Sequence, residues 1–274
     1  MADRPNILWY CSDQQRFDTI GALGNGHINT PRLDAFAGEG VAFTHAYCQS
    51  PICTPSRASF LTGAYPSAVG VNGNGNEFFP RGQESRLLPH RLAESGYDCG
   101  LVGKLHLASP ALGTERRVED GYRYFRYSHD HKGPRVYGHD YAEWVREQGG
   151  DADALMGPYV TKTYREGAKV KTFGGLYEPT EAEDNIPSEL HQTHWCSEKS
   201  IEFIEKNRRE GQPWLLSVNP FDPHPPYDAP WEYYRRYDPD TLPGAHFAAG
   251  DLEQQQRLVA AGVDFQSQLQ EPSA

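Results

Sequence analysis

The chain has 274 residues, and its 26 lysines and arginines stand against 37 aspartates and glutamates, which gives a formal net charge of −11. Hydrophobic residues make up 38% of the sequence and aromatic residues 12%, which argues against an intrinsically disordered chain. The acidic balance argues against a nucleic-acid partner, because neutralising phosphates requires a basic surface. No apolar run approaches the roughly 18–20 residues that cross a bilayer, so no membrane partner is expected either.

The N-terminal residues M-A-D-R-P-N run directly into a short apolar stretch. They lack the basic start, the longer apolar core and the small-residue cleavage site of a signal peptide, so a cytoplasmic protein is expected. The cysteines are odd in number and scattered, and we expect them to be reduced thiols rather than a disulfide framework. They are Cys11, Cys48, Cys53, Cys99 and Cys196.

Short apolar runs alternate with helical patterns along the chain. Strands are predicted at residues 7–12, 41–46, 99–103 and 214–218, and helices at residues 32–38, 57–62, 87–94 and 190–207. Asn29, Thr30 and Pro31 offer an N-cap and a proline for the start of the first helix. In the last helix, Ile201 and Ile204 are expected to face inward. The alternation predicts an α/β architecture with a mostly parallel sheet, which places its sites at the carboxyl ends of strands.

Residues 110–187 are rich in glycine, tyrosine and charge and show little periodicity. We interpret them as a long excursion over the active face, the kind of loop that carries specificity. Within it, His129, His131 and His139 are expected to lie mostly on the surface, with a place near the substrate as the alternative.

The most informative segment is C-T-P-S-R at residues 53–57, followed by A-S-F-L-T-G up to residue 63. Five further blocks accompany it in order: P-N-I-L at 5–8 with Asp13, T-P-R-L-D at 30–34, G-V-A-F at 40–43, G-K-L-H at 103–106 and P-H-P-P-Y at 223–227. Together they resemble the type I sulfatases, in which the cysteine of the motif is oxidised after translation to formylglycine. The resemblance is nearest the choline-sulfatase and phosphonate monoester hydrolase branches and runs to about residue 230. Six ordered blocks are far more specific than a single C-x-P-S-R.

This resemblance implies an alkaline-phosphatase-like three-layer sandwich with a mostly parallel central sheet. It implies hydrolysis of a small sulfate monoester to an alcohol or phenol plus sulfate, with a formylglycine-generating enzyme as the maturation partner. A serine that attacked a sulfate ester would itself remain a stable ester. An aldehyde hydrate at Cys53 has two hydroxyls: one attacks sulfur, and deprotonation of the other expels sulfate and restores the aldehyde. A plain buried thiol is the alternative for Cys53.

Four further side chains receive catalytic roles from the resemblance. Arg57 lies one helical turn after the nucleophile and holds the hydrated aldehyde. Lys104 contacts sulfate oxygens, and His106 is the base that deprotonates the second hydroxyl. Both were expected to project to one side because they lie two apart at a strand end. His224 contacts the sulfate and helps to protonate the leaving oxygen.

The family also uses a hard divalent cation, usually Ca²⁺, which prefers oxygen ligands. Asp13 fits the first ligand position, and residue 53 contributes an oxygen once it is modified. Gln14 stands where the commonest pattern has a second aspartate, so its amide would bring one negative charge fewer. Asn74 matches a substrate-contacting asparagine of the two nearest branches, with turn formation in a Gly/Asn-rich loop as the alternative.

The remaining metal ligands and the second lysine of the family lie beyond the block that holds His224, and this chain lacks them. After residue 230 it offers only Asp238, Asp240, Asp251 and Asp264. We therefore interpret residues 1–274 as the N-terminal part of a sulfatase catalytic domain, with 230–274 as a truncated tail.

Other interpretations stay open. The same scaffold serves phosphonate monoester and phosphodiester hydrolases, and a non-catalytic relic would keep the scaffold without a complete metal site. His191 and His194 share a helical face near Cys196 and suggest a zinc pair, although no third ligand accompanies them. Cys48 and His45, close to the nucleophile in sequence, invite a similar reading.

Overall fold

The chain is described here from a computed structural model. It describes residues 4–110, 114–130, 138–156, 186–225, 227–244, 248 and 250–261. The chain divides into two compact units, Met1–Tyr234 and Arg235–Ala274. Among the described residues, no helix combines the length and apolar character that a bilayer crossing requires.

Four parallel strands form one sheet in the order β1–β4–β2–β3. The strands are β1 (Ile7–Tyr10), β2 (Asp98–Gly103), β3 (Tyr124–Tyr127) and β4 (Trp214–Asn219). At the carboxyl end of the central pair, Gly103 lies opposite both Asn219 and Tyr127. Because all strands run the same way, their carboxyl ends meet at one edge, where open parallel sheets place ligand sites. The prediction of a mostly parallel sheet is confirmed.

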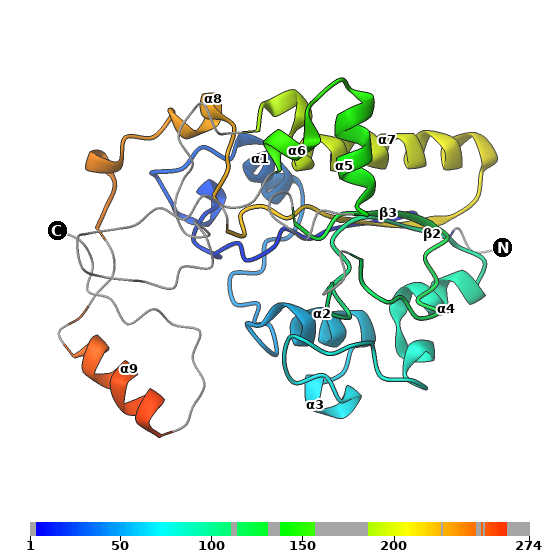
Figure 1. Ribbon diagram of the computed structural model, residues 1–274, viewed down its shortest axis with the longest axis horizontal. Coiled ribbons are helices and arrows are strands. Elements are labelled where there is room, and N and C mark those ends of the chain that lie inside the picture. The colour runs from blue at the N-terminus through cyan, green and yellow to red at the C-terminus, as the bar shows by residue number, and fades with distance from the viewer. Residues whose placement is uncertain are drawn as a thin grey trace. The chain divides into compact units, whose positions relative to one another are not determined.

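Helices cover both faces of this sheet, which gives three layers (Figure 1). One face carries α2 (Cys53–Thr62), α3 (Pro66–Val69) and α4 (Leu88–Glu94), and the other carries α5 (Asp140–Glu147), α6 (Ala152–Leu155) and α7 (Gln192–Glu210). The first unit also holds α1 (Pro31–Glu39), α8 (Trp231–Tyr234) and 3-10 helices at Gly21–Leu23, Glu84–Arg86 and Ser188–Leu190. The second unit holds a 3-10 helix at Pro239–Thr241 and helix α9 (Asp251–Ala260).

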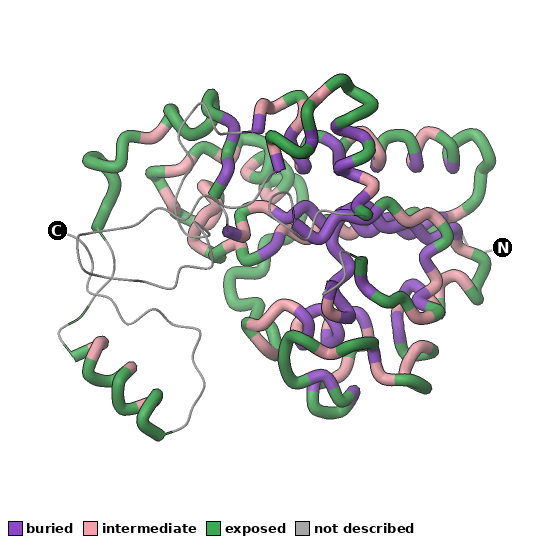
Figure 2. Tube along the Cα trace, in the orientation of Figure 1, coloured by how far each residue is buried: buried purple, intermediate pink, exposed green. Residues whose placement is uncertain are grey.

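The two faces of the sheet bury separate hydrophobic clusters, and Figure 2 shows buried residues along the strands and on the helix faces that meet them. Leu101 of β2 packs into the cluster below the sheet with Ala58 and Leu61 of α2. Its neighbour Val102 points to the other cluster, with Phe203 of α7. Successive strand residues point to opposite faces, so a strand covered on both sides reads as one continuous apolar run.

Helix α7 meets the sheet through a face whose residues recur at helical spacing. Cys196, Ser200, Phe203 and Asn207 are buried, three or four residues apart. Ile201 lies outside this stripe and is 60% exposed, so the prediction that it faces inward is wrong. The aromatic ring of Phe203, rather than the isoleucine, occupies the place against the sheet.

Two other predictions about elements are corrected by the structure. Residues 41–46 form no strand, and Val41 and Phe43 are exposed. The strand predicted at 7–12 ends at Tyr10, and Leu8 and Tyr10 of β1 are each 55% exposed. In both places large apolar side chains remain exposed in the described part of the chain.

The range 110–187, expected as one long excursion, contains regular elements in its described parts. Strand β3 forms an edge of the sheet, and α5 packs on the same face as α7. Tyr141 and Trp144 of α5 belong to the core. Residues 131–137 and 157–185 of this range lie outside the described residues.

Candidate active site

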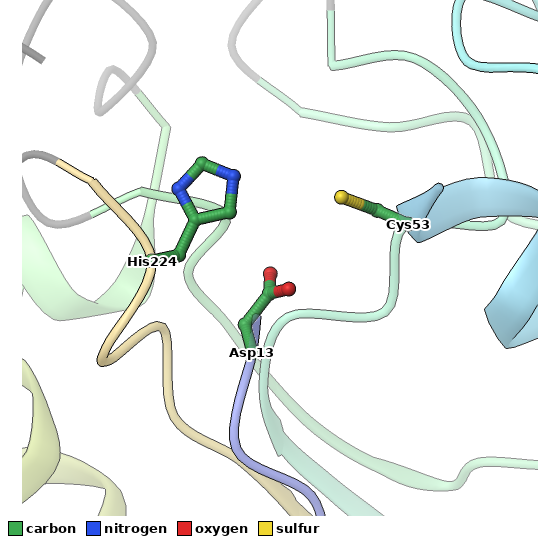
Figure 3. Close-up of side chains that lie close together, drawn as sticks. All are labelled: Asp13, Cys53 and His224. Atoms are coloured by element: carbon green, nitrogen blue, oxygen red, sulfur yellow. The ribbon is translucent and has the colours of Figure 1, made fainter. Parts of the chain in front are cut away.

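Three side chains from distant parts of the sequence converge at the carboxyl edge of the sheet. Asp13 follows β1, His224 follows β4, and Cys53 is the first residue of α2. Figure 3 shows the three side chains pointing toward one another, and their ligand atoms all lie within 4.8 Å of each other. In the described part of the chain, no other group of three His, Cys, Asp or Glu side chains converges in this way.

Cys53 lies at the start of a helix, so the helix predicted at 57–62 begins four residues earlier. Helix α2 begins at Cys53, and its N-cap residue Ile52 makes no side-chain capping bond. The first backbone N–H groups of a helix lack intrahelical acceptors, and the helix dipole there favours an anion. One of these donors is already used, because the N–H of Thr54 donates to Oδ1 of Asn74 (3.0 Å). The structure thus shows Asn74 as a cap at the start of α2, next to Cys53.

Arg57 is buried one turn along α2, on the side of the helix that meets the strand ends. Its Nη1 donates to the backbone carbonyl of Lys104 (2.7 Å), and its Nη2 lies 3.6 Å from Oδ2 of Asp13. The guanidinium therefore joins α2 to the ends of β1 and β2, and it brings a permanent positive charge to within one helical turn of the nucleophile.

Lys104 is 1% exposed, and its ammonium donates to the Asp13 carboxylate. Its carbonyl accepts a second bond from Nδ2 of Asn219 (2.8 Å). The preceding Gly103 has a φ of +102°, and a Cβ there would lie 2.0 Å from the Asn219 carbonyl oxygen. Glycine is therefore required at 103, because it lets the chain turn out of β2 against β4 and carry Lys104 into the site.

The charge balance around Asp13 favours an anion. Burial alone would raise the pKa of Asp13, but Lys104, Arg57 and His224 together hold it below its ordinary value. The carboxylate therefore stays ionised at neutral pH. Two buried cations contact this one carboxylate, and the surplus positive charge suits a sulfate or phosphate group.

His224 presents one ring nitrogen to the site. Its Nδ1 lies 2.6 Å from the carbonyl oxygen of Pro225, which can only accept, so Nδ1 carries the proton. Burial and the charge of Lys104 lower the pKa of His224. The neutral ring then offers a lone pair at Nε2, and the expected role in protonating a leaving oxygen requires a second proton on this ring.

His106 is buried in the loop after β2. The predicted reason for its orientation, that Lys104 and His106 alternate along one strand, is wrong. Strand β2 ends at Gly103, and His106 has a φ of +54°, so Lys104 and His106 are not alternate residues of one extended strand. Burial and the positive charge of Lys104 hold the pKa of His106 well below its ordinary value. A neutral imidazole at this place has the lone pair that a base needs.

Glu115 holds the backbone around His106, and sequence reasoning missed it. Its carboxylate accepts the N–H groups of His106 (2.5 Å), Leu107 (3.0 Å) and Ala108 (3.4 Å). Burial raises the pKa of Glu115 to about 7, against these three bonds, which favour the charged form. No motif marks this residue, because its partners are backbone groups that any sequence provides.

The excursion also contributes buried histidines, so the expectation that they lie mostly on the surface is wrong for two of them. His129 is 2% exposed and His139 is fully buried. His131 lies outside the described residues. His129 and Asp130 are a buried imidazole beside a buried carboxylate. The sequence letters H-D would look the same in a solvated loop, so the sequence alone does not reveal this burial.

The alternative metal readings lose their support in the described residues. Nδ1 of His191 accepts the N–H of Thr193 at the start of α7 (3.3 Å), the side chain of His194 is 51% exposed, and Cys196 is buried in the core. Cys48 and His45 are exposed. Neither set forms a three-ligand group in the part of the chain described.

The donors at the main site fit part of a hard-cation site. Asp13 supplies a carboxylate, and position 53 supplies an oxygen only after its thiol is oxidised. Gln14 follows Asp13 with a φ of +57° and an exposed side chain. A Ca²⁺ ion takes 6–8 oxygen ligands, so the described residues account for one side of such a site.

Known proteins match this chain both in sequence and in fold. The sequence model of the family described as Sulfatase matches residues 5–261. An arylsulfatase of Clostridium perfringens is 30% identical over 250 residues, covering 88% of this chain and 47% of that protein. An ulvan-active sulfatase of Formosa agariphila is 30% identical over 240 residues, covering 87% of this chain and 39% of that protein. Among solved structures, the phosphonate monoester hydrolase of Agrobacterium radiobacter aligns with a TM-score of 0.67 and 26% identity, over 94% of this chain and 49% of that one.

The parallel three-layer architecture places the chain in the alkaline-phosphatase-like fold class, and the cysteine at the start of α2 lies beside Asp13 and His224. Within that class, the chain belongs to the sulfatase family. It spans about half the length of the relatives it matches, 47% of the arylsulfatase and 49% of the phosphonate monoester hydrolase.

Proposed function

We propose that the protein hydrolyses a sulfate monoester to an alcohol or phenol plus sulfate. The observation that carries this proposal is the convergence of Cys53, Asp13 and His224 at the carboxyl edge of the sheet, beside two buried cations. Membership of the sulfatase family and the 30% identity to an arylsulfatase support it. The substrate is a small ester, since a net charge of −11 disfavours a highly sulfated polymer.

Oxidation of Cys53 to formylglycine, by a formylglycine-generating enzyme, belongs to the proposal. Once formed, the hydrated aldehyde supplies a hydroxyl nucleophile that a thiol does not. The chain's own residues prepare its surroundings. Arg57 and Lys104 hold positive charge where the sulfate oxygens would lie, and the N-terminal end of α2 adds its dipole.

Proton transfer is assigned to the two histidines. His106, held neutral by burial, accepts a proton from the hydroxyl that restores the carbonyl. His224 contacts the sulfate group through Nε2, because its Nδ1 is occupied by the Pro225 carbonyl. In the doubly protonated state it donates to the leaving oxygen, and the pKa of His224, lowered by burial and by Lys104, limits that state to the acidic side.

A divalent cation, Ca²⁺ by preference, completes the proposed site. Asp13, Gln14 and the oxygen at position 53 are the residues of this chain that would hold it. When bound, the ion polarises the sulfate group. Oδ1 of Asn74 caps the start of α2, and its amide nitrogen is the group assigned to substrate contact.

A phosphonate monoester or phosphodiester hydrolase is the second candidate, and one observation favours it. The solved structure of the Agrobacterium radiobacter phosphonate monoester hydrolase matches 94% of this chain. The ratio of kcat/KM on the two kinds of ester distinguishes the two activities. The matured full-length gene product should hydrolyse an aryl sulfate with a higher kcat/KM than the matching aryl phosphonate monoester. A reversed ratio would replace the sulfatase proposal by the second candidate.

A further inference from the structure

A second imidazole lies against His106, outside the set of residues assigned to the reaction. The rings of His106 and His129 are 4.4 Å apart between centroids and almost perpendicular, at 82°. His106 comes from the loop after β2, whereas His129 follows β3. The contact therefore joins two neighbouring strand ends at the edge of the sheet that carries the site.

The ring of His129 is itself fixed by a carboxylate. Its Nδ1 lies 2.7 Å from Oδ1 of Asp130, and both side chains are buried. A carboxylate can only accept, so Nδ1 carries the proton and Nε2 keeps its lone pair. Nε2 of His129 has no hydrogen-bond partner in the structure. The bond to Asp130 is therefore the hydrogen bond that orients the ring of His129.

The ring of His106, unlike its backbone, is not held by a hydrogen bond at Nδ1. Glu115 binds the backbone N–H of His106 and of the next two residues, which fixes the main chain but not the rotation of the ring. Nδ1 of His106 is buried and has no hydrogen-bond partner. A base must hold its lone pair within about 3 Å of the proton it removes. Among the described residues, the ring contact that the structure gives to His106 is the one with His129.

We propose that His129, oriented by Asp130, is a positioning residue that holds the imidazole of His106 in the direction required of the base. This inference rests on the proposed function of His106. Its physical content is a chain from carboxylate to imidazole to imidazole, in which the first member fixes the second and the second restricts the third.

Burial, helped by the positive charge of Lys104, lowers the pKa of both imidazoles of the pair. Lys104, Arg57 and His224 face His106, and Lys104, Asp130 and His139 face His129. Burial, with Lys104 as the next cause, lowers the pKa of His129 to about 4. Both rings are thus uncharged near neutral pH, and His129 acts by packing and orientation rather than by exchanging protons in that range.

The test is a double-mutant cycle in the full-length gene product, co-expressed with a formylglycine-generating enzyme and assayed on an aryl sulfate. His129→Phe keeps a ring but removes the bond to Asp130, and Asp130→Asn keeps the shape but removes the charge. Each should lower kcat on the order of 10–100-fold, as for other residues that orient an active group, with KM changed less than about twofold. In a His106→Ala background, His129→Phe should cost nothing further. His194→Phe, an exposed histidine of α7, is the matched control and should leave kcat unchanged.

A crystal structure of the His129→Phe protein gives a readout that does not depend on turnover. The ring of His106 should be displaced or spread over more than one orientation, while Glu115 still binds its backbone. Unchanged kcat in His129→Phe, an equal loss in both backgrounds, or an unmoved His106 ring would overturn the proposal. Cys53→Ala distinguishes the two failures. If it turns over normally, the proposed function itself is wrong. If it is inactive while one of the results above is found, the proposed function stands and only the positioning role of His129 is wrong.

Discussion

Arg57 makes two contacts that depend on the shape of its side chain. One arm donates to the Lys104 carbonyl and the other approaches the Asp13 carboxylate. A lysine carries the same charge but has a single ammonium that cannot serve both partners.

Replacing Arg57 by lysine should therefore lower kcat/KM for an aryl sulfate on the order of 100-fold, since one fixed cationic donor is lost from the site. Steady-state kinetics of the matured protein measure this. Arg16→Lys is the matched control, because Arg16 pairs with Asp18 on the surface, and its kcat/KM should stay within twofold of the wild type. Equal rates for Arg57→Lys and Arg16→Lys would show that the guanidinium geometry does not matter.

Glu115 should make the stability of the fold depend on pH. Burial raises its pKa from 4.5 to about 7, so the folded state binds this proton more tightly than the unfolded chain does. The contribution of Glu115 to the free energy of unfolding is therefore full below about pH 4.5 and is lost as the pH rises through 7. Urea unfolding at pH 5, 6, 7 and 8 measures it. Glu115→Gln should flatten this part of the pH profile, and an unchanged slope would contradict the assignment.

At the level of elements, the start of α2 depends on a residue twenty positions away in sequence. Asn74 accepts the Thr54 N–H and takes the place of a side-chain N-cap, which Ile52 does not provide. Loss of a helix-capping oxygen costs about 1 kcal/mol.

Asn74→Ala should thus lower the free energy of unfolding by about 1 kcal/mol, measured by urea titration. Asn72→Ala, two residues earlier and also exposed, is the control and should change it by less than about 0.5 kcal/mol. If both variants unfold alike, the bond to Thr54 contributes nothing to the helix start.

The sequence was most informative where function fixes residues at short spacing. The six ordered blocks point to Cys53, Arg57, Asp13, Lys104 and His224, although the predicted helix covers only residues 57–62. The structure brings Asp13 together with Cys53 and His224, and it pairs Asp13 with Arg57 and Lys104. The resemblance carried by these blocks identifies the residues, because each motif keeps its functional side chains at a fixed short spacing.

Contacts between distant segments were not readable in the same way. Strand β1 pairs with β4, more than 200 residues further on, and no apolar pattern specifies such a partner. The apolar residues at 41–46 predicted a strand, but they form none and stay exposed. Glu115 and His129 carry no motif, since one binds backbone groups and the other is recognised only by its buried carboxylate and ring neighbours.

On the scale of the whole molecule, large apolar side chains stay exposed near the N-terminal end. Leu8, Tyr10, Phe17, Phe36, Val41, Phe43 and Tyr47 are all at least 55% exposed. Soluble monomers seldom leave so many large apolar groups in water within one short stretch of chain.

The 274-residue chain expressed by itself should therefore self-associate or bind a hydrophobic dye such as ANS. Sedimentation velocity at increasing concentration measures the first. The double variant Phe36→Ser and Phe43→Ser should shift the population toward monomer, whereas a wild-type chain that remains a dye-silent monomer at all concentrations would show that these side chains are covered in solution.

Cys53 is central to the proposed function, because it begins α2 and its side chain meets Asp13 and His224 at the edge of the sheet. The most direct measurement pairs mass analysis of the peptide that contains residue 53 with aryl sulfate turnover of the same full-length preparation. The account predicts an aldehyde in place of the thiol, turnover in proportion to the fraction converted, and none in Cys53→Ala. Turnover by Cys53→Ala at the wild-type rate, or full activity from a preparation in which the thiol is intact, would contradict it.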